Sequence, residues 1–147
     1  MTTMKAARKR AQAKVEYNAF MAACPSRQLL DRISDKWVVL ILCALGGDNS
    51  SRQPATHADA PKAMRYSEIS RLLAGVSQKM LTQTLRSLER DGLLTRTATP
   101  TVPVTVSYEL TDLGLSLHHM TRGLRNWAQT HMDEVLTSRE NYDSRTT

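Results

Sequence analysis

The sequence is poor in aromatic residues and in cysteine. Aromatic side chains make up 5% of the 147 residues, and phenylalanine occurs once. Proteins that bind single-stranded nucleic acid commonly stack bases on aromatic side chains, so this composition argues against that function. The two cysteines, Cys24 and Cys43, are too few for the disulfide framework of a small secreted protein. In a reducing compartment, the property of interest is a reactive thiol.

The chain also lacks a long apolar run. The longest run, Trp37–Leu45, has nine residues, whereas a helix that crosses a membrane needs about 18. The N-terminus is basic, but no apolar block of the signal-peptide type follows it. We therefore expect a cytoplasmic protein without a membrane partner.

Motifs of catalysis and of metal binding are absent as well. The four histidines show no metal-ligand spacing, and adjacent His118 and His119 point to different sides of a helix. The sequence contains no glycine-rich phosphate loop, nucleophile elbow or pair of carboxylates arranged for catalysis. We therefore expect neither an enzyme nor a bound metal or other cofactor.

Positive charge is what the sequence has in excess. The 20 Lys and Arg residues outnumber the 14 acidic residues, which gives a net charge of +6 and a pI of about 9.7. This balance favours a polyanionic partner, with nucleic acid ahead of an acidic membrane. Residues 1–22 are especially basic and are consistent with an arm on phosphate, a helix on a partner subunit, or a disordered tail.

Residues 77–92 form the central motif of the sequence, and the other predicted elements are arranged around it. Ser77 is a good N-cap, and Gly92 can adopt the left-handed conformation that ends a helix. Apolar residues at spacings of four and three make one stripe: Leu81, Leu85 and Leu88. The other sides carry uncharged or positive side chains that can hydrogen-bond: Gln78, Lys79, Thr82, Gln83 and Arg86. The stretch is therefore either a DNA-recognition helix, which a major groove about 12 Å wide admits, or an ordinary amphipathic surface helix.

A short helix is expected before this stretch. Ser67 caps a helix over residues 68–73, whose Ile69, Leu72 and Leu73 face inward. Residues 74–76 contain a glycine and make the turn into the long helix. Two helices joined by such a turn are typical of a helix-turn-helix motif, in which the second helix contacts the groove.

A β-hairpin is expected after residue 92. Residues 93–99 form its first strand, and residues 100–103 form a proline-rich tip. The second strand, residues 104–110, alternates apolar and polar positions, with Val104, Val106, Tyr108 and Leu110 on one face. A helix-turn-helix followed directly by a hairpin predicts a winged helix.

The N-terminal half is expected to supply a buried helix and a loop. Cys24 precedes Pro25 and is an expected N-cap, and the helix that follows has an apolar face made by Leu29, Leu30 and Ile33. Ser34-Asp35 starts a new helix over residues 36–45, which is apolar enough to be central in the core and buries Cys43. Residues 46–64 have loop composition, and we expect a mobile insertion.

The last helix is expected to begin at Thr111-Asp112. Its apolar residues follow a four-three rhythm with a lapse at His131: Leu113, Leu117, Met120, Leu124, Trp127 and Val135. This seam is longer than a small domain needs, which favours an inter-subunit surface over packing on its own core. The polar residues 137–147 are expected to be disordered.

Several segments resemble the HxlR-type branch of bacterial winged-helix regulators, which is related to the MarR group. In chain order they are Cys24-Pro25, Lys36-Trp37, Arg65 to Ile69, Ser77 to Thr82, Leu88 to Leu93, Pro100 to Pro103, Tyr108 to Thr111, and Gly114. The resemblance implies a homodimeric regulator of transcription that binds double-stranded DNA, usually as a repressor and sometimes as an activator. Several members resemble sensors of electrophiles or oxidants that act through the cysteine at the position of Cys24.

Three departures from the family pattern stand out. Residues 46–64 look like an insertion where the family crosses in a short turn. Ser34-Asp35 replaces a Gly-Gly or Leu-Gly pair before Lys36-Trp37. The wing has no basic residue between Pro100 and Val106, which weakens the expectation of a minor-groove contact there.

The sequence therefore predicts a mainly α (α+β) winged helix-turn-helix protein with a β-hairpin wing and flanking N- and C-terminal dimerisation helices. The expected division is a basic arm at 1–22, a DNA-binding domain at 23–112 with the insertion at 46–64, a dimerisation helix at 113–136, and a tail at 137–147. The expected groove-facing residues are Ser77, Gln78, Lys79, Thr82, Gln83 and Arg86, since Gln pairs with adenine and Lys or Arg with guanine. Phosphate contacts are expected from Arg65, Ser67 and Arg96.

Cys24 is the candidate for redox sensing. The positive end of a helix favours a thiolate over a thiol, and an accessible thiolate is attacked first by oxidants. An inert capping cysteine is the alternative. Two other functions also stay open: control of the same fold by a small molecule at the dimer interface, and a winged-helix protein-interaction module that does not bind DNA. The polar and positive face of residues 78–86 argues against the protein-interaction module.

Overall fold

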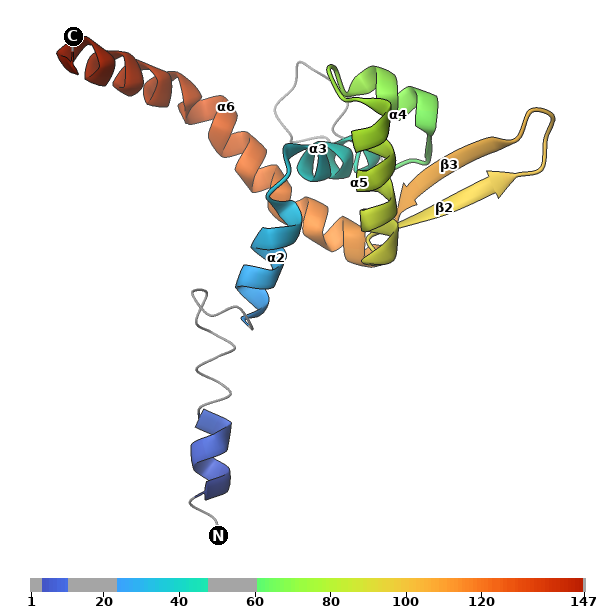
Figure 1. The fold of residues 1–147 in the computed structure, drawn as a ribbon, viewed down its shortest axis with the longest axis horizontal. Coiled ribbons are helices and arrows are strands. Elements are labelled where there is room, and N and C mark those ends of the chain that lie inside the picture. The colour runs from blue at the N-terminus through green and yellow to red at the C-terminus, as the bar shows by residue number, and fades with distance from the viewer. Residues whose placement is uncertain (1–3, 11–23, 48–60, 147) are drawn as a thin grey trace. The chain divides into compact units, whose positions relative to one another are not determined.

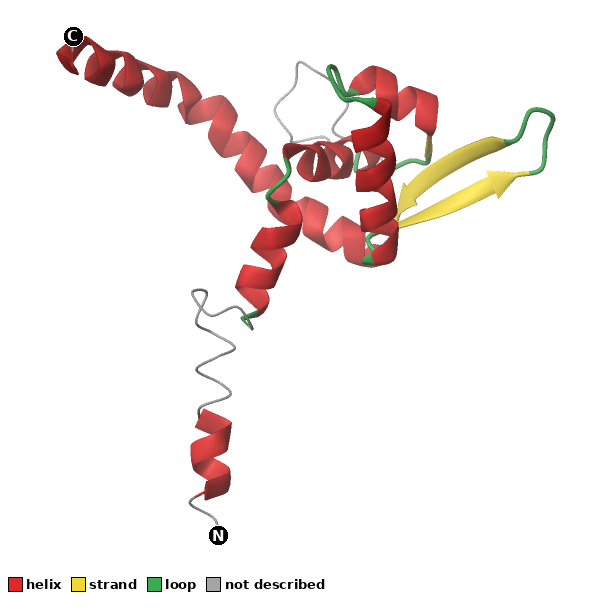
Figure 2. Ribbon diagram, in the orientation of Figure 1, coloured by secondary structure: helices red, strands yellow, loops and turns green. Residues whose placement is uncertain are grey.

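Figure 1 shows the protein as a computed structural model that describes residues 4–10, 24–47 and 61–146. Most of the predicted insertion at residues 46–64 and most of the arm at residues 1–22 lie outside these ranges. The chain divides into two compact units, Met1–Val38 and Val39–Thr147. Figure 2 shows that helices make up most of the described chain. In that part of the chain, no helix combines the length and apolarity that a membrane crossing requires.

The first unit contains a basic helical segment and helix α2. Residues 4–10 are helical, and their side chains are exposed. Helix α2 spans Pro25–Ile33, and Cys24 occupies its N-cap with extended backbone, as predicted. The expected apolar face of α2 is only partly covered, because Leu29 and Ile33 are half-buried whereas Leu30 is 57% exposed.

Helix α3 spans Lys36–Leu45 and joins the two units. The predicted cap is present, since the Asp35 carboxylate accepts a hydrogen bond of 2.9 Å from the Trp37 backbone N–H. In the second unit, Ile41, Leu42 and Leu45 are fully buried, and Cys43 is buried with them. The prediction of a central core helix that contains Cys43 is therefore confirmed.

Helix α4 spans Tyr66–Leu72 and begins two residues before the predicted start. The N-cap is Arg65 instead of Ser67, because the Glu68 carboxylate accepts a hydrogen bond of 3.2 Å from the Arg65 backbone N–H. Ile69 is buried as predicted. The prediction that Leu72 faces inward was wrong, since this side chain is 44% exposed at the end of the helix.

Helix α5 spans Gln78–Arg90, in agreement with the sequence prediction. The Ser77 hydroxyl accepts a hydrogen bond of 3.1 Å from the Met80 backbone N–H, which is the predicted cap. At the other end, Gly92 has a φ of +76°. The Gly92 N–H donates to the Glu89 carbonyl and the Leu93 N–H donates to the Leu88 carbonyl, at 3.0 and 2.9 Å. These two bonds form a Schellman motif that fixes where the helix ends.

The wing is an antiparallel hairpin of β2 (Leu94–Thr99) and β3 (Thr105–Leu110). The sequence did not predict a third strand, β1 (Met64–Arg65), which pairs with β3 on its other edge. Within the second unit, Figure 1 shows the hairpin projecting beyond α4 and α5, with β2 starting where α5 ends. Tyr108 and Leu110 are buried as expected, whereas Val104 lies outside the strand and is exposed.

Helix α6 runs from Asp112 to Thr146, a length of 35 residues. Its predicted cap is present, because the Thr111 hydroxyl accepts a hydrogen bond of 3.1 Å from the Gly114 N–H. The structure differs from the prediction of a disordered tail, since residues 137–146 continue the helix. This segment contains no glycine or proline, and extending an existing helix costs far less free energy than nucleating a new one.

Candidate nucleic-acid interface

The exposed side of α5 carries one stripe of long polar side chains. Successive helical residues lie about 100° apart around the axis, so spacings of four, three and four keep side chains in line. The stripe consists of Lys79, Gln83, Arg86 and Arg90, which are all exposed. The three leucines of the predicted apolar stripe are at most 2% exposed and lie about 180° around the helix from it. The helix therefore presents amide and cationic groups while its opposite face is fixed in the core.

The first turn of α5 is tied to the start of α4 through one tyrosine. The Tyr66 hydroxyl donates to the Gln78 carbonyl oxygen at 3.2 Å and lies 3.3 Å from the Thr82 hydroxyl. Thr82 is only half exposed, and the Ser77 hydroxyl is occupied as the cap. Among the predicted groove residues, Ser77 and Thr82 thus position the helix, while the side chains of Gln78, Lys79 and Gln83 are exposed.

The predicted phosphate-contacting residues lie on the elements beside α5. Arg65 pairs with Ser107 across the edge of the sheet, and Ser67 lies in the first turn of α4. Arg96 lies on β2, directly opposite Tyr108 on β3. All three predicted phosphate-contacting side chains are exposed.

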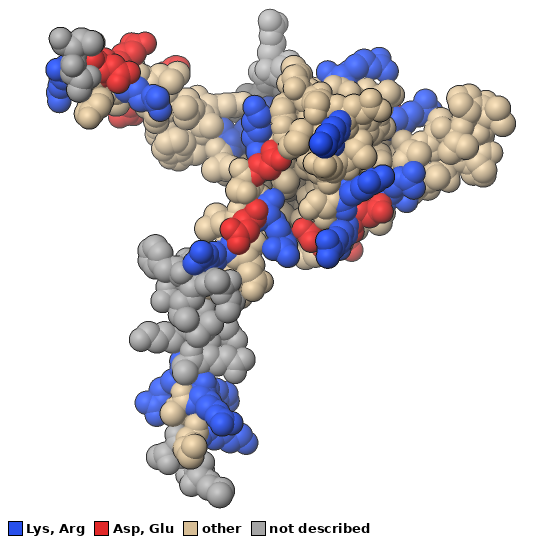
Figure 3. All heavy atoms as spheres, viewed as in Figure 1, with Lys and Arg blue, Asp and Glu red and all other residues tan. Residues whose placement is uncertain are grey.

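The surface charge changes along the wing. Figure 3 shows Lys and Arg side chains, with a few acidic ones among them, around α5 and the base of the wing. The projecting end of the wing carries no charged side chain on this face. At the tip, Val102 is fully exposed and Val104 is 63% exposed. A phosphate contact through charge is therefore expected at the base of the wing and not at its tip.

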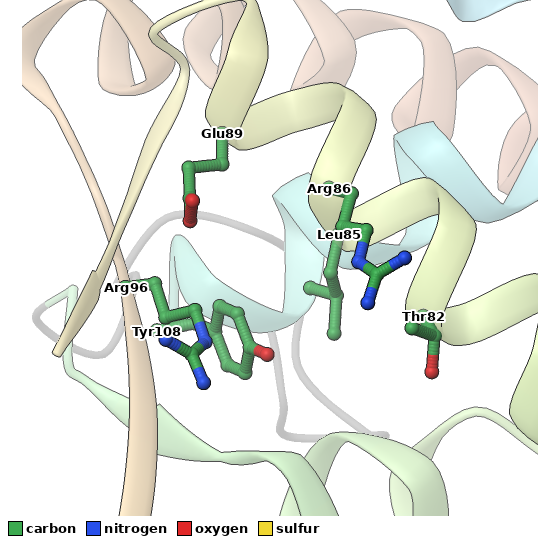
Figure 4. Close-up of a pocket in the computed structure, with 6 residues that line it drawn as sticks. All are labelled: Thr82, Leu85, Arg86, Glu89, Arg96 and Tyr108. Carbon is green, nitrogen blue, oxygen red and sulfur yellow. The ribbon is translucent and has the colours of Figure 1, made fainter. Parts of the chain in front are cut away.

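A polar hollow of about 400 Å³ lies between α5 and the wing. Thr82, Leu85, Arg86 and Glu89 of α5 line one side, and Arg96 and Tyr108 of the hairpin line the other. Figure 4 shows the two arginine side chains entering this space from different elements. The structure thus brings together Arg86 and Arg96, for which the sequence predicted separate roles.

The chain with this helix-turn-helix, hairpin and long final helix matches the model of a known protein family. The model for HxlR-like helix-turn-helix proteins matches residues 32–136, which is most of the chain. The chain belongs to the HxlR family. The predicted resemblance and winged-helix fold are confirmed, and the protein is a transcriptional regulator of the DNA-binding helix-turn-helix type.

Relatives within the HxlR family cover most of the chain. The uncharacterized helix-turn-helix transcriptional regulator YtfH of Escherichia coli strain K12 is 40% identical, over 85% of this chain and 88% of that protein. A solved structure, assigned as the transcriptional regulator ytfH of Salmonella typhimurium, is 38% identical with a TM-score of 0.67 and covers 84% of this chain and 97% of its own. The redox regulator HypR in its oxidized form is 29% identical with a TM-score of 0.59, over 73% of this chain and 96% of its own.

The candidate redox residue of this HxlR-family chain is buried. The Cys24 side chain is 0% exposed, although its backbone holds the predicted N-cap position. Arg27, one turn into the same helix, is exposed. The prediction of an accessible Cys24 thiol therefore does not hold in this conformation. A reaction at the thiol requires local opening around the start of α2.

Four residues of α5 and of the elements that pack beside it were not identified from the sequence as parts of the candidate site. Arg90 continues the exposed stripe of α5, and its spacing of four from Arg86 was an available signal. Tyr66 positions the first turn of α5, and Glu89 and Tyr108 line the hollow. For these three residues the decisive fact is a contact between distant segments, which no local pattern indicates.

Proposed function

We propose that this HxlR-family protein is a homodimeric, sequence-specific regulator that represses transcription from the promoters it binds. Its α5 lies in the major groove of double-stranded DNA, with Gln78, Lys79 and Gln83 at base edges. Arg65, Ser67 and Arg96 contact phosphates and set the register of the helix without reading sequence. A dimer seated on a promoter excludes RNA polymerase from the same DNA, which accounts for repression.

The observation that carries this proposal is the exposed polar stripe on α5. The Gln83 side chain is exposed at the centre of the stripe, and a glutamine amide matches the donor and acceptor edge of adenine. An interaction module for proteins would present apolar or acidic side chains on this face. The net charge of +6 favours the same polyanionic partner.

Replacing Gln83 with alanine is expected to remove discrimination at one base pair of each half-site. The loss corresponds to about 1–3 kcal/mol between the preferred and the other base pairs, because one bidentate contact disappears. The measurement is a gel-shift titration on a duplex selected from a random pool by the wild-type protein, with each base pair varied in turn. Gln129→Ala, on the exposed surface of α6, is the matched control and is expected to keep the full preference. An unaltered preference in Gln83→Ala would refute the base contact.

We also propose that Cys24 makes DNA binding sensitive to oxidants. The proposal is supported by the position of this cysteine at the N-terminus of α2 and by the likeness of the chain to the redox regulator HypR. A peroxide-type oxidant converts the thiolate to a sulfenic acid. The sulfenic acid then condenses with the Cys24 thiol of the other protomer to a disulfide, with release of water. Because the side chain is buried, the reaction is limited by local opening.

Oxidant treatment is expected to change the affinity of the wild-type protein for its selected duplex and to leave that of Cys24→Ser unchanged. Cys43→Ser is the matched control, because it removes the other buried thiol and keeps the proposed sensor. Gel shifts and non-reducing electrophoresis after mild oxidant treatment measure the two effects. An equal response of Cys24→Ser and wild type, or no response in either, would show that this cysteine is an inert cap.

A further inference from the structure

We propose that the hollow between α5 and the wing binds a single phosphodiester of the DNA backbone, held by Arg86, Arg96 and the Tyr108 hydroxyl. This inference rests on the proposed function and assigns Arg86 a role at phosphate instead of at a base edge. The ligand chemistry is a phosphate oxyanion, and the occupant is a phosphate of bound double-stranded DNA.

The first support is the convergence of two cations. Arg86 enters the hollow from α5 and Arg96 enters from β2, as Figure 4 shows. No hydrogen bond or ion pair joins either guanidinium to another described residue. Two guanidinium groups and one carboxylate line the hollow, so its lining carries a net positive charge. Forked N–H donors from two sides match the oxygens of a phosphate.

The second support is a buried polar side chain without a partner. Tyr108 is 8% exposed, and its hydroxyl makes no hydrogen bond to any described residue. Figure 4 shows this hydroxyl pointing into the hollow. The hydroxyl oxygen itself is accessible from the hollow, so it is available to donate a hydrogen bond to an anion bound there.

The third support is the place of the hollow on the molecule. It lies between the recognition helix and the base of the wing, and a volume of about 400 Å³ exceeds the space of a few waters. The exposed stripe on α5 and the hollow share Arg86, so DNA that meets the stripe brings its backbone to the hollow. The tip of the wing, residues 100–104, contains no charged side chain that could supply a contact of this kind.

A neutral phosphate replacement tests the proposal directly. Duplexes selected by the wild-type protein are resynthesised with one methylphosphonate at each backbone position in turn, and binding is measured by gel shift. The wild-type protein is expected to lose affinity when the methylphosphonate occupies one particular position in each half-site. The double variant Arg86→Gln/Arg96→Gln is expected to show no such loss at that position. Arg139→Gln, an exposed position on α6 with the same change in charge, is expected to behave as wild type.

The salt dependence of binding separates one shared phosphate from two independent ones. The double variant is expected to lower the slope of log affinity against log salt by about 0.9, which is the value for one phosphate. A fall of about 1.8 would mean two separate phosphates, and a lost preference at one base pair would mean that Arg86 reads a base. Either result would overturn the proposal.

Glu89 provides a variant that gains affinity and so is not confounded by misfolding. The Glu89 carboxylate lines the hollow, and it repels a phosphate bound there. Glu89→Gln is expected to strengthen binding to all duplexes by roughly three- to tenfold. Glu109→Gln has the same change in net charge, but Glu109 is absent from the lining of the hollow, and it is expected to have a smaller effect.

A final comparison distinguishes a phosphate of bound DNA from a free anion as the occupant of the hollow. Inorganic phosphate is titrated into the free protein by calorimetry alongside the methylphosphonate series. Weak phosphate binding together with a methylphosphonate-sensitive position supports a DNA phosphate. Tight binding of inorganic phosphate without any sensitive position would assign the hollow to a free anion and overturn the proposal. Failure to select any duplex would refute the proposed function itself, which is a separate result.

Discussion

Replacing Gly114 with alanine is expected to destabilise the protein by about 1–3 kcal/mol, although alanine is a better helix former than glycine. Gly114 lies in the first turn of α6, where an added Cβ would collide with the Leu93 carbonyl oxygen and approach Leu110 Cδ2 to 3.2 Å. The backbone at Leu93 cannot yield easily, because its carbonyl accepts a hydrogen bond of 3.1 Å from the Thr111 N–H. The start of α6 must therefore move.

The displacement of α6 also affects α5, the proposed recognition helix. The Thr111 hydroxyl donates to the Gly92 carbonyl oxygen at 2.6 Å and accepts from the Gly114 N–H at 3.1 Å. One side chain thus joins the end of α5 to the start of α6. A displaced α6 breaks this connection, so Gly114→Ala is also expected to weaken DNA binding.

Chemical denaturation at a fixed protein concentration measures the stability change, since the midpoint of an associating protein depends on concentration. Gly123→Ala is the matched control in the same helix, because no described atom beyond its chain neighbours and the nearby backbone of its own helix lies within 4 Å of the added Cβ. This control is expected to gain up to about 1 kcal/mol from helix propensity. A Gly114→Ala protein at least as stable as wild type would contradict the predicted collision.

Local patterns predicted helix α5 and the wing. The cap at Ser77, the left-handed Gly92 and the leucine stripe of α5 each depend on residues a few positions apart. The alternation that placed Tyr108 and Leu110 inward is equally local. These patterns depend on backbone geometry and burial within one helix or strand. They can therefore be recognised in the sequence without knowledge of the fold.

The features that were missed depend on long-range or marginal interactions. Strand β1 has two residues and exists because Met64 and Arg65 pair with β3, more than forty positions later. The last turns of α6 have polar composition typical of a tail, and they extend a helix that is already formed. The start of α4 depends on the hydrogen bond that the Glu68 carboxylate accepts from the Arg65 backbone N–H.

The candidate site also combines features that local patterns predict with features that depend on long-range packing. The sequence identified the polar face of α5, because the helical period alone sorts its residues. It could not show that Thr82 is engaged by Tyr66, nor that Arg86 and Arg96 enter one hollow. Both facts follow from how α5 packs against α4 and against the hairpin.

Replacing Leu124 with glutamate is expected to separate the proposed dimer and to lower affinity for the selected duplex by about 100-fold or more. Leu124 and Trp127 are 59% and 53% exposed, and they belong to the apolar seam that also contains the exposed Leu113 and Met120. A contiguous exposed apolar surface of this length marks an interaction site. Two linked recognition helices bind with an avidity of about 10²–10⁴ over one, which the variant loses.

The seam is available because α6 packs on its own domain with a different face. Gly114, His118 and Thr121 are the buried residues of this helix, and they lie about 100° around the axis from the seam. The His118 ring lies against Gly46, so close that an added Cβ there would collide with it. Within the described part of the second unit, the exposed leucines are therefore not needed for packing, and Leu124→Glu is expected to leave the fold of that unit intact.

Sedimentation equilibrium and gel shifts on the same protein distinguish the outcomes. Gln129→Glu adds the same charge to an exposed position of α6 outside the seam and is expected to keep both assembly and affinity. A Leu124→Glu protein that assembles like wild type would refute the seam as the interface. A monomeric variant with wild-type affinity would instead show that one recognition helix suffices. The seam would then need a different partner, because an apolar surface of this extent is costly to leave in water.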